Sequence, residues 1–153
     1  MNLTAEILNI HHFPMDIYQY ENLSALAIIC NEFLADYQYP VIINSGLRDM
    51  ALQIEVDFPR HPKKSAHLVG CAVDIHDEQN RLLEYVLSHL DLARKIGLFF
   101  ENPNWTPTWC HIQDVAPKSG HRFFVPDSSP PKCNRWSGIY DRKYDSPWIK
   151  QEA

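Results

Sequence analysis

Positive charge is scarce in this sequence, because 14 lysine and arginine residues stand against 19 aspartate and glutamate residues, for a formal net charge of -5 at pH 7. This balance argues against nucleic acid as the main partner and provides no attraction to an anionic membrane surface. Long apolar runs are missing, so no segment is predicted to cross a membrane. The N-terminus lacks a basic stretch followed by an apolar one. We therefore expect no signal peptide and a cytoplasmic location at synthesis.

Paired cysteine motifs are also missing. The four cysteines, Cys30, Cys71, Cys110 and Cys133, form no Cys-x-x-Cys pair, and we expect reduced, buried thiols. No internal repeat is present. A length of 153 residues, with 45% hydrophobic and 22% charged residues, is typical of a soluble globular protein. We predict a single domain over 1–153, large enough to fold without disulfide or metal staples.

Hydrophobic periodicity predicts an α+β fold. Helices are expected over 3–10, over 22–37 with Asn22 as the N-cap, over 49–57, and over 82–95 with Gly97 near its end. Strands are expected over 41–46, 71–76, 98–101 and 108–113, with a weaker strand or hairpin within 118–125. The apolar stripe of the 22–37 segment is suited to packing on a sheet. We predict a small, mainly antiparallel sheet with helices packed on one face.

The stretch from Ser65 to Asp74 is the most informative part of the chain. Its second half alternates with a period of two, typical of a strand with one apolar face and one face that carries Asp74 and His76. His67 lies in the loop before that strand, and Gly70 leaves room for a close approach to the backbone. Imidazole and carboxylate groups are good zinc ligands. His67 and Asp74 are therefore candidate metal ligands.

The pattern Ser-x-His-x-x-Gly-x-Ala-x-Asp, made by Ser65, His67, Gly70, Ala72 and Asp74, resembles the signature of the zinc D-Ala-D-Ala carboxypeptidase family of murein peptidases. That family includes phage endolysins that cut L-alanyl-D-glutamate bonds. The resemblance implies a Zn²⁺ cofactor held by the histidine and the aspartate. It also implies that the serine contributes to substrate binding and that the substrate is a peptidoglycan stem peptide.

A second resemblance to the family lies in Ser45-Gly46-Leu47-Arg48. Family members often carry Ser-Gly-Tyr-Arg at about this distance before the histidine motif. The resemblance implies that Arg48 binds a substrate carboxylate or carbonyl oxygen and assists catalysis. A guanidinium suits that role because it stays charged and offers a rigid fork of donors. Leu47 replaces the commoner tyrosine and removes one polar contact. A structural ion pair is the alternative role for Arg48.

The predicted strand over 108–113 places Trp109, His111 and Gln113 on one face. Its Trp-x-His sequence resembles the segment that carries the family's last zinc ligand. The resemblance implies that His111 is the third ligand and that Trp109 contacts substrate. Three protein ligands leave a fourth position for water, which is typical of catalytic zinc. The metal cleft is then expected on the sheet face opposite the helices.

The position at which the family carries its general base differs in this chain. Many relatives carry an acid three residues before the last histidine, but this chain has Thr108 there, and a threonine cannot act as a base at neutral pH. Glu101, at the end of the preceding strand, is the best substitute, because a hairpin would bring its carboxylate to the metal. A surface acid is the alternative for Glu101. Asp114, His76 and Asp77 are weaker candidates.

Together these patterns predict a zinc metallopeptidase, either a carboxypeptidase or an endopeptidase, that cleaves peptidoglycan stem peptides as a monomer. Without an export signal, a phage-lysin-like enzyme that reaches the wall after release fits best. The threonine at position 108 leaves a second interpretation open, a catalytically silent zinc domain with a structural or wall-binding role. A metal-free interaction module is the third.

Overall fold

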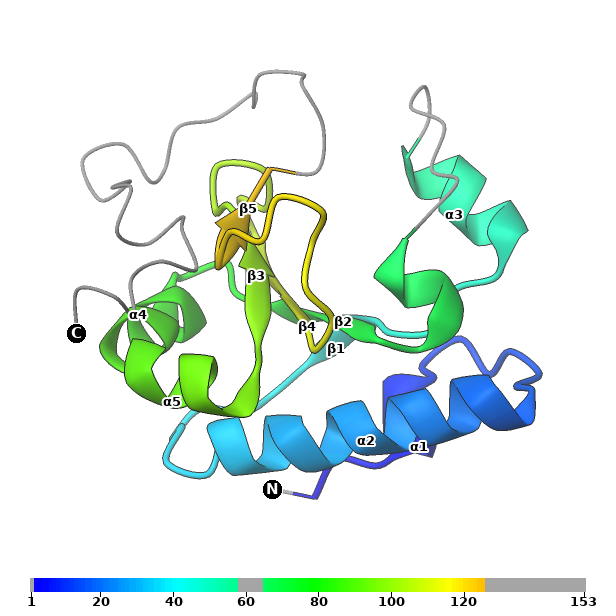
Figure 1. Cartoon of the computed structure of the whole chain (residues 1–153), viewed down its shortest axis with the longest axis horizontal. Helices are drawn as coiled ribbons and strands as arrows, with labels where there is room; N and C mark the ends of the chain where they lie inside the picture. The colour runs from blue at the N-terminus through cyan, green and yellow to red at the C-terminus, as the bar shows by residue number, and fades with distance from the viewer. Residues whose placement is uncertain (1, 58–64, 126–153) are drawn as a thin grey trace.

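The computed structural model describes residues 2–57 and 65–125 of the chain (Figure 1). Its helices are α1 (Ala5–Leu8), α2 (Ile17–Phe33), α3 (Met50–Asp57), α4 (Arg81–Ser88) and α5 (Leu90–Ile96), with a short 3-10 turn, η1 (Ala66–Val69). Its strands are β1 (Ile43–Ser45), β2 (Ala72–His76), β3 (Phe99–Glu101), β4 (Trp109–Gln113) and β5 (Phe123–Phe124).

The five strands form one sheet in the order β1-β2-β4-β3-β5. The first three neighbouring pairs are antiparallel, and β3 and β5 are parallel. The predicted α+β class and the mainly antiparallel sheet are therefore confirmed. The adjacent strands β2 and β4 carry Asp74, the end of the Ser65–Asp74 motif, and the Trp109–Gln113 motif side by side.

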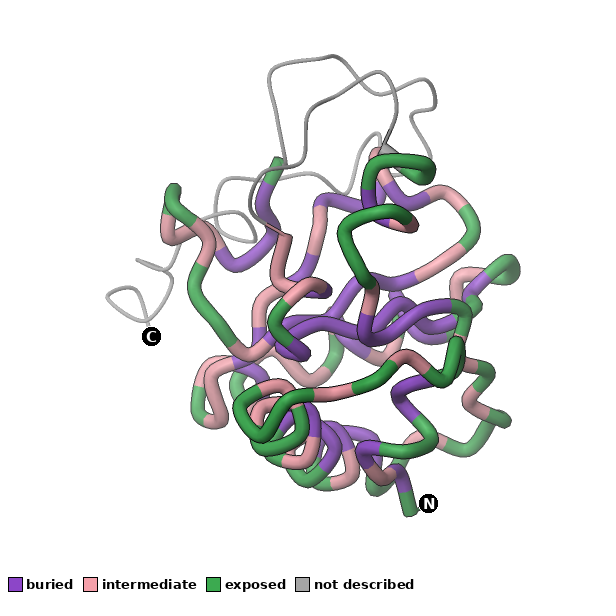
Figure 2. The backbone as a smooth tube through the Cα atoms, turned by 90° about the vertical axis from the view of Figure 1, so that its right-hand side faces the viewer, coloured by how far each residue is buried: buried purple, intermediate pink, exposed green. Residues whose placement is uncertain are grey.

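The hydrophobic core lies between one face of the sheet and the helices α1, α2, α4 and α5 (Figures 1 and 2). The sheet contributes Val73, Ile75 and Ile112 to this core, and α2 contributes Leu26 and Phe33, among others. Because strand side chains alternate between faces, Asp74 and His111 lie on the opposite face. The layer of helices therefore leaves the polar face of β2 and β4 for a functional site.

Helix α2 begins earlier than the sequence pattern predicted. The expected N-cap, Asn22, lies inside the helix, and Asp16 caps it instead. The Gln19 N–H donates to the Asp16 carboxylate over 2.7 Å, and the Asp16 N–H donates to the Gln19 side chain over 3.0 Å, which forms a capping box. The helix ends at Phe33 rather than near Tyr37.

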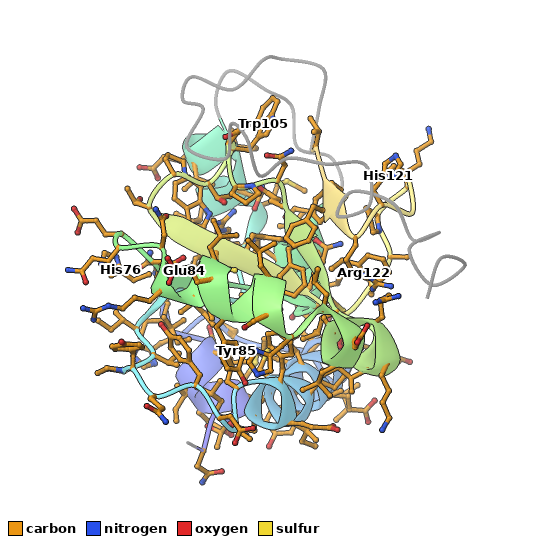
Figure 3. The ribbon with its side chains drawn as sticks, turned by 90° about the vertical axis from the view of Figure 1, so that its left-hand side faces the viewer. His76, Glu84, Tyr85, Trp105, His121 and Arg122 are labelled. Carbon is orange, nitrogen blue, oxygen red and sulfur yellow. The ribbon has the colours of Figure 1, made fainter. Side chains whose placement is uncertain are left out.

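The predicted helix over 82–95 is also corrected, because it consists of two helices that break at His89. The ring of His89 stacks on Tyr85, with 3.8 Å between ring centroids, and its Nδ1 lies 2.7 Å from the Tyr85 carbonyl oxygen. Tyr85 also donates to the Phe33 carbonyl over 2.6 Å and so joins α4 to α2 (Figure 3). Gly97 ends α5 with a φ of 83°, as its position predicted.

Three of the four cysteines lie in the described part of the chain, and Cys30, Cys71 and Cys110 are all buried thiols. This confirms the expectation of buried thiols for those three; Cys133 lies outside the described residues. Burial raises the pKa of Cys30 to about 12 and that of Cys71 to about 11. Within residues 2–57 and 65–125, no helix is long and apolar enough to cross a bilayer.

Candidate metal centre

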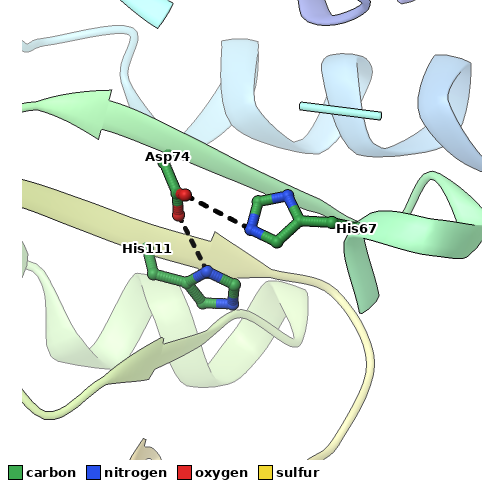
Figure 4. A group of neighbouring side chains, drawn as sticks. All are labelled: His67, Asp74 and His111. Carbon is green, nitrogen blue, oxygen red and sulfur yellow. Dashed lines mark hydrogen bonds and ion pairs between the residues drawn. The ribbon is translucent and has the colours of Figure 1, made fainter. Parts of the chain in front are cut away.

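His67, Asp74 and His111 converge on the polar face of the sheet, as Figure 4 shows. Each offers one ligand atom, and these three atoms all lie within 4.8 Å of one another. All three residues are buried, with exposed fractions of 2%, 6% and 4% respectively. Asp74 and His111 are direct cross-strand partners on β2 and β4. The structure thus brings together the three candidate ligands that the sequence motifs indicated.

The turn η1 holds His67 at the edge of this cluster. Ser65 is its N-cap, and the Ser65 hydroxyl accepts the His67 N–H over 3.2 Å. The side chains of Gln19 and Asn22 on α2 donate to the carbonyls of Leu68 and Val69 over 3.0 and 2.9 Å. Helix α2 therefore fixes η1 to the rest of the domain.

Gly70 explains how η1 packs so closely on α2. It is the C-cap of η1 with a φ of 79°, a left-handed conformation that favours glycine. A Cβ at this position would lie 2.8 Å from the Gln19 carbonyl oxygen. The close approach that the sequence predicted at Gly70 is thus the approach of α2 itself.

The hydrogen bond of His67 selects which of its ring nitrogens is available. Its Nδ1 lies 2.7 Å from the carbonyl oxygen of Gly46. A carbonyl only accepts, so Nδ1 carries the proton and Nε2 presents its lone pair. That Nε2 lies 3.3 Å from Asp74 Oδ2. His67 is therefore oriented to bind a cation through Nε2.

His111 presents the opposite nitrogen. Its Nδ1 lies 2.9 Å from Asp74 Oδ1, and its Nε2 lies 2.8 Å from the side-chain oxygen of Gln113. Phe124 on β5 packs edge-on against the ring, with 5.8 Å between centroids. Nδ1 is thus the His111 atom that points to the centre of the cluster. Its two ring partners are oxygens, which favours a doubly protonated ring when no cation is bound.

The charges within the cluster are strongly coupled. Burial lowers the pKa of His67 and outweighs the opposing effect of Asp74. Burial also opposes a charge on His111, but Glu101, the Asp74 hydrogen bond and the Asp74 charge raise the pKa of His111 to about 9. Burial alone would raise the pKa of Asp74, yet the electrostatic effect of His67 and the hydrogen bond from His111 bring it below its usual range. The ionised Asp74 therefore faces a proton on His111 Nδ1, and a bound cation can replace that proton.

The donor set fits zinc. Ligands at about 2.0–2.2 Å from a tetrahedral ion lie about 3.4 Å from one another. One ligand atom from each of His67, Asp74 and His111 lies within 4.8 Å of the other two, a span that admits a single ion among them. Each imidazole donates its other N–H to an oxygen of the protein, an arrangement that is usual for histidine ligands. The cluster is therefore a site that could hold a metal ion.

Arg48 lies beside the cluster, bonded to Asp74. Its NH2 donates to Asp74 Oδ2 over 2.7 Å, its Nε to the hydroxyl of Ser45 over 2.8 Å, and its NH1 to the side chain of Gln53 over 3.1 Å. Its backbone N–H donates to the His67 carbonyl over 3.1 Å. The side chain is only 12% exposed. Arg48 thus orients Asp74 in addition to any contact it makes with substrate.

The neighbouring Leu47 has a structural explanation. The side chain is 1% exposed and belongs to the hydrophobic core. The core position accounts for an apolar residue at this place in the chain.

Glu101 is the carboxylate that the structure brings beside the candidate ligands. Its Oε1 lies 3.8 Å from His111 Nδ1. The pairing of β3 with β4, which matches Phe100 with Ile112, produces this placement. Backbone bonds from β5 on the other side of β3 add support, because Phe100 donates to the Arg122 carbonyl over 2.8 Å.

The weaker candidates for the general base, Asp77, His76 and Asp114, make side-chain contacts with residues other than the three candidate ligands. Both carboxylate oxygens of Asp77 accept backbone N–H groups at the start of α4, from Leu82 and Leu83, at 2.8 and 2.9 Å. His76 is exposed, lies at the edge of the molecule in Figure 3, and is 3.7 Å from Glu78. Asp114 is half-buried and hydrogen-bonds Cys71.

The two further residues predicted to bind substrate lie close to the cluster in the fold. Ser65 is half-buried and caps η1 through its hydroxyl. Trp109 is half-buried on β4, two residues from His111 and opposite His76. Sequence reasoning did not assign roles to Gln53 and Phe124, which touch Arg48 and His111. Gln53 lies five residues after Arg48 and Phe124 lies on a different strand from His111, and no motif in the sequence indicated either contact.

No protein-family model matches the chain, and no curated protein matches it in sequence. Among solved structures, the L-Ala D-Glu endopeptidase ChiX of Serratia marcescens is similar, with 23% sequence identity and a TM-score of 0.45. The alignment covers 69% of this chain and 92% of that chain. A likeness at this level does not by itself assign an activity.

Proposed function

We propose that this protein is a zinc-dependent peptidase that cleaves peptide bonds in peptidoglycan stem peptides. The observation that carries the proposal is the buried convergence of His67, Asp74 and His111, with Glu101 at 3.8 Å from the last of them. Two imidazoles and one carboxylate are a catalytic rather than a structural zinc set, because they leave a coordination position for substrate or water. The substrate class rests on the family resemblance of the Ser65–Asp74 and Ser45–Arg48 motifs.

Each residue of the site has a role that its geometry supports. His67 through Nε2, His111 through Nδ1 and the Asp74 carboxylate would hold the ion. Zinc in such a site supplies Lewis-acid chemistry that polarises a carbonyl and acidifies water. Glu101, 3.8 Å from His111 Nδ1, would accept a proton from the attacking water and pass it to the leaving amine.

Arg48 completes the site. Two of its five N–H donors remain beyond the three that bond Ser45, Gln53 and Asp74. It would use them to orient a substrate oxygen, since a guanidinium stays charged and directs its donors in fixed directions. The same residue would then position both a ligand and the substrate.

Digestion of purified cell wall tests the proposal. The zinc-loaded protein should release soluble peptides, a chelator should stop the reaction, and added zinc should restore it. Mass spectrometry of the products distinguishes an L-alanyl-D-glutamate cut from loss of a terminal D-alanine. Failure to release any product at any zinc concentration would contradict the proposal.

Glu101→Gln separates the proton acceptor from the metal site. Loss of a general base lowers turnover by about 10²–10⁴-fold, while zinc content should stay at the wild-type level. Glu78→Gln is the matched control, because the Glu78 side chain is 71% exposed and pairs with His76 outside the cluster. Equal turnover in Glu101→Gln and wild type would exclude Glu101 as the base.

A catalytically silent zinc domain is the second candidate, and Thr108 is the observation that favours it. The backbone carbonyl of Thr108 accepts the Asp77 N–H over 2.8 Å, and a threonine cannot replace the acid that relatives carry there. A zinc-loaded protein that binds cell wall and cuts nothing would support this function. Measurable turnover that depends on Glu101 would exclude it.

A further inference from the structure

A chain of two hydrogen bonds runs away from the metal cluster along β4. His111 Nε2 lies 2.8 Å from Gln113 Oε1, and Gln113 Nε2 donates to the carbonyl of Val115 over 2.8 Å. The Val115 carbonyl only accepts, so it requires the amide nitrogen of Gln113 on its side. The amide oxygen of Gln113 must then face His111.

The orientation of this amide determines the proton on His111. An amide oxygen only accepts, so His111 Nε2 must carry a hydrogen. Nδ1 is then the nitrogen whose lone pair a cation can use, and it is the one that faces Asp74 Oδ1 at 2.9 Å. Without this acceptor, the imidazole could place its single proton on either nitrogen, and half of those arrangements would direct a hydrogen at the ion.

The surroundings of Gln113 hold its side chain in place. The residue is 7% exposed, and on the sheet it lies between Ala72 of β2 and Phe99 of β3. Ala72 is fully buried and small, so it leaves the space beside it to the longer amide. A buried amide with both of its groups satisfied in opposite directions cannot rotate without losing two hydrogen bonds.

We propose that Gln113 is the positioning residue of the metal centre: it fixes the Nε2–H tautomer of His111 and so directs Nδ1 to the ion. The proposal rests on the metal site of the proposed function. Gly46 does the same for His67 with a backbone carbonyl, at 2.7 Å from Nδ1. Of the two histidines, His111 is therefore the one whose hydrogen-bond partner is a side chain.

Zinc affinity in substituted proteins tests the proposal. Gln113→Leu removes both hydrogen-bonding groups and keeps a similar volume, so the zinc Kd should rise by about 10–100-fold, the usual effect of losing a partner of a histidine ligand. Gln113→Glu keeps an acceptor for the His111 Nε2–H, so its zinc affinity should be no weaker than that of the wild type. A competing chromophoric chelator measures both constants.

Asn31→Leu is the matched control for a lost amide. Asn31 lies on α2, and its amide accepts from and donates to the backbone of Leu3, at 2.8 and 3.0 Å. Its loss should lower the melting temperature without changing the zinc Kd. A purely structural role for Gln113 would give the same result in both leucine variants.

Nitrogen-15 NMR of the histidine rings in the zinc-loaded wild type gives a direct measurement that no folding defect of a variant can obscure. The proposal expects a protonated Nε2 and a metal-bound Nδ1 for His111. A protonated Nδ1, or a Gln113→Leu variant with wild-type zinc affinity and the same tautomer, would overturn it. If the wild type binds no zinc at all, the proposed function and this inference both fail; if it binds zinc but His111 carries the proton on Nδ1, only this inference fails.

Discussion

Substitution of Gly46 by alanine tests whether the backbone behind His67 sets the geometry of the metal centre. Gly46 is buried against α1, and a Cβ added there would overlap the carbonyl oxygen of Leu8 and lie 2.8 Å from the carbonyl carbon. These are backbone atoms of a helix, so they cannot move aside as a flexible side chain would. The segment around Gly46 must shift instead, and with it the carbonyl that accepts from His67 Nδ1.

The free-energy cost of Gly46→Ala follows from these contacts with Leu8. Packed atoms must stay about 3 Å or more apart, so relief of the overlap takes a shift of about 1 Å or more. Added to the 2.7 Å between His67 Nδ1 and the Gly46 oxygen, such a shift breaks the hydrogen bond. Overpacking costs about 1–3 kcal/mol, and a buried donor left unpaired costs about 1–3 kcal/mol more.

Thermal unfolding and zinc titration measure the two consequences of Gly46→Ala. A loss of about 2–6 kcal/mol lowers the melting temperature of a domain of this size by about 4 °C at the least. The zinc Kd should rise by about 10–100-fold, because His67 loses the partner that orients it.

Gly97→Ala is the control for Gly46→Ala. It adds a methyl group with nothing within 4 Å but strains a φ of 83°, so it should cost about 1–2 kcal/mol and leave zinc binding unchanged. If Gly46→Ala kept both the wild-type melting temperature and the wild-type zinc Kd, the argument would be wrong.

Three further predictions concern the cluster itself. His67→Ala, Asp74→Ala and His111→Ala should each lower zinc affinity by orders of magnitude, since two ligands cannot hold the site; unchanged metal content in all three variants, measured by mass spectrometry, would refute the ligand set. Arg48→Ala should retain zinc and lose turnover on cell wall; loss of the metal would show that its bond to Asp74 is its main role. Zinc affinity should increase as the pH rises from 6 towards 9, because zinc must displace a proton from His111, whose pKa is raised to about 9; calorimetry in buffers of different ionisation enthalpy detects that proton.

Local patterns predicted the sheet faces of Asp74 and His111 better than they predicted the bounds of the helices. The alternation of β2 and β4 placed Asp74 and His111 on polar faces, and the structure pairs them directly. The pattern could not give the register of the two strands, which depends on backbone pairing between residues far apart in the chain, such as Asp74 and His111. That register brings the carboxylate to the imidazole.

The errors in the predicted helix bounds come from contacts that a periodic pattern of apolar residues does not contain. The apolar spacing of 82–95 continues across His89, so the break between α4 and α5 appears only through the stacking of His89 on Tyr85. Asn22 is a good capping residue, but the reciprocal bonds of Asp16 and Gln19 begin α2 earlier. The parallel pairing of β5 with β3 is non-local and equally invisible to the pattern.

The three candidate ligands do not all belong to the sheet. Asp74 and His111 are on adjacent central strands, whereas His67 is on a turn that α2 supports from outside. An ion shared among them would hold that turn against the strands, and it would bind the folded chain in preference to the unfolded one, because only folding brings the three ligands together. The bound cation would thus stabilise the folded state. Zinc should raise the melting temperature by an amount set by the free zinc concentration relative to the zinc Kd.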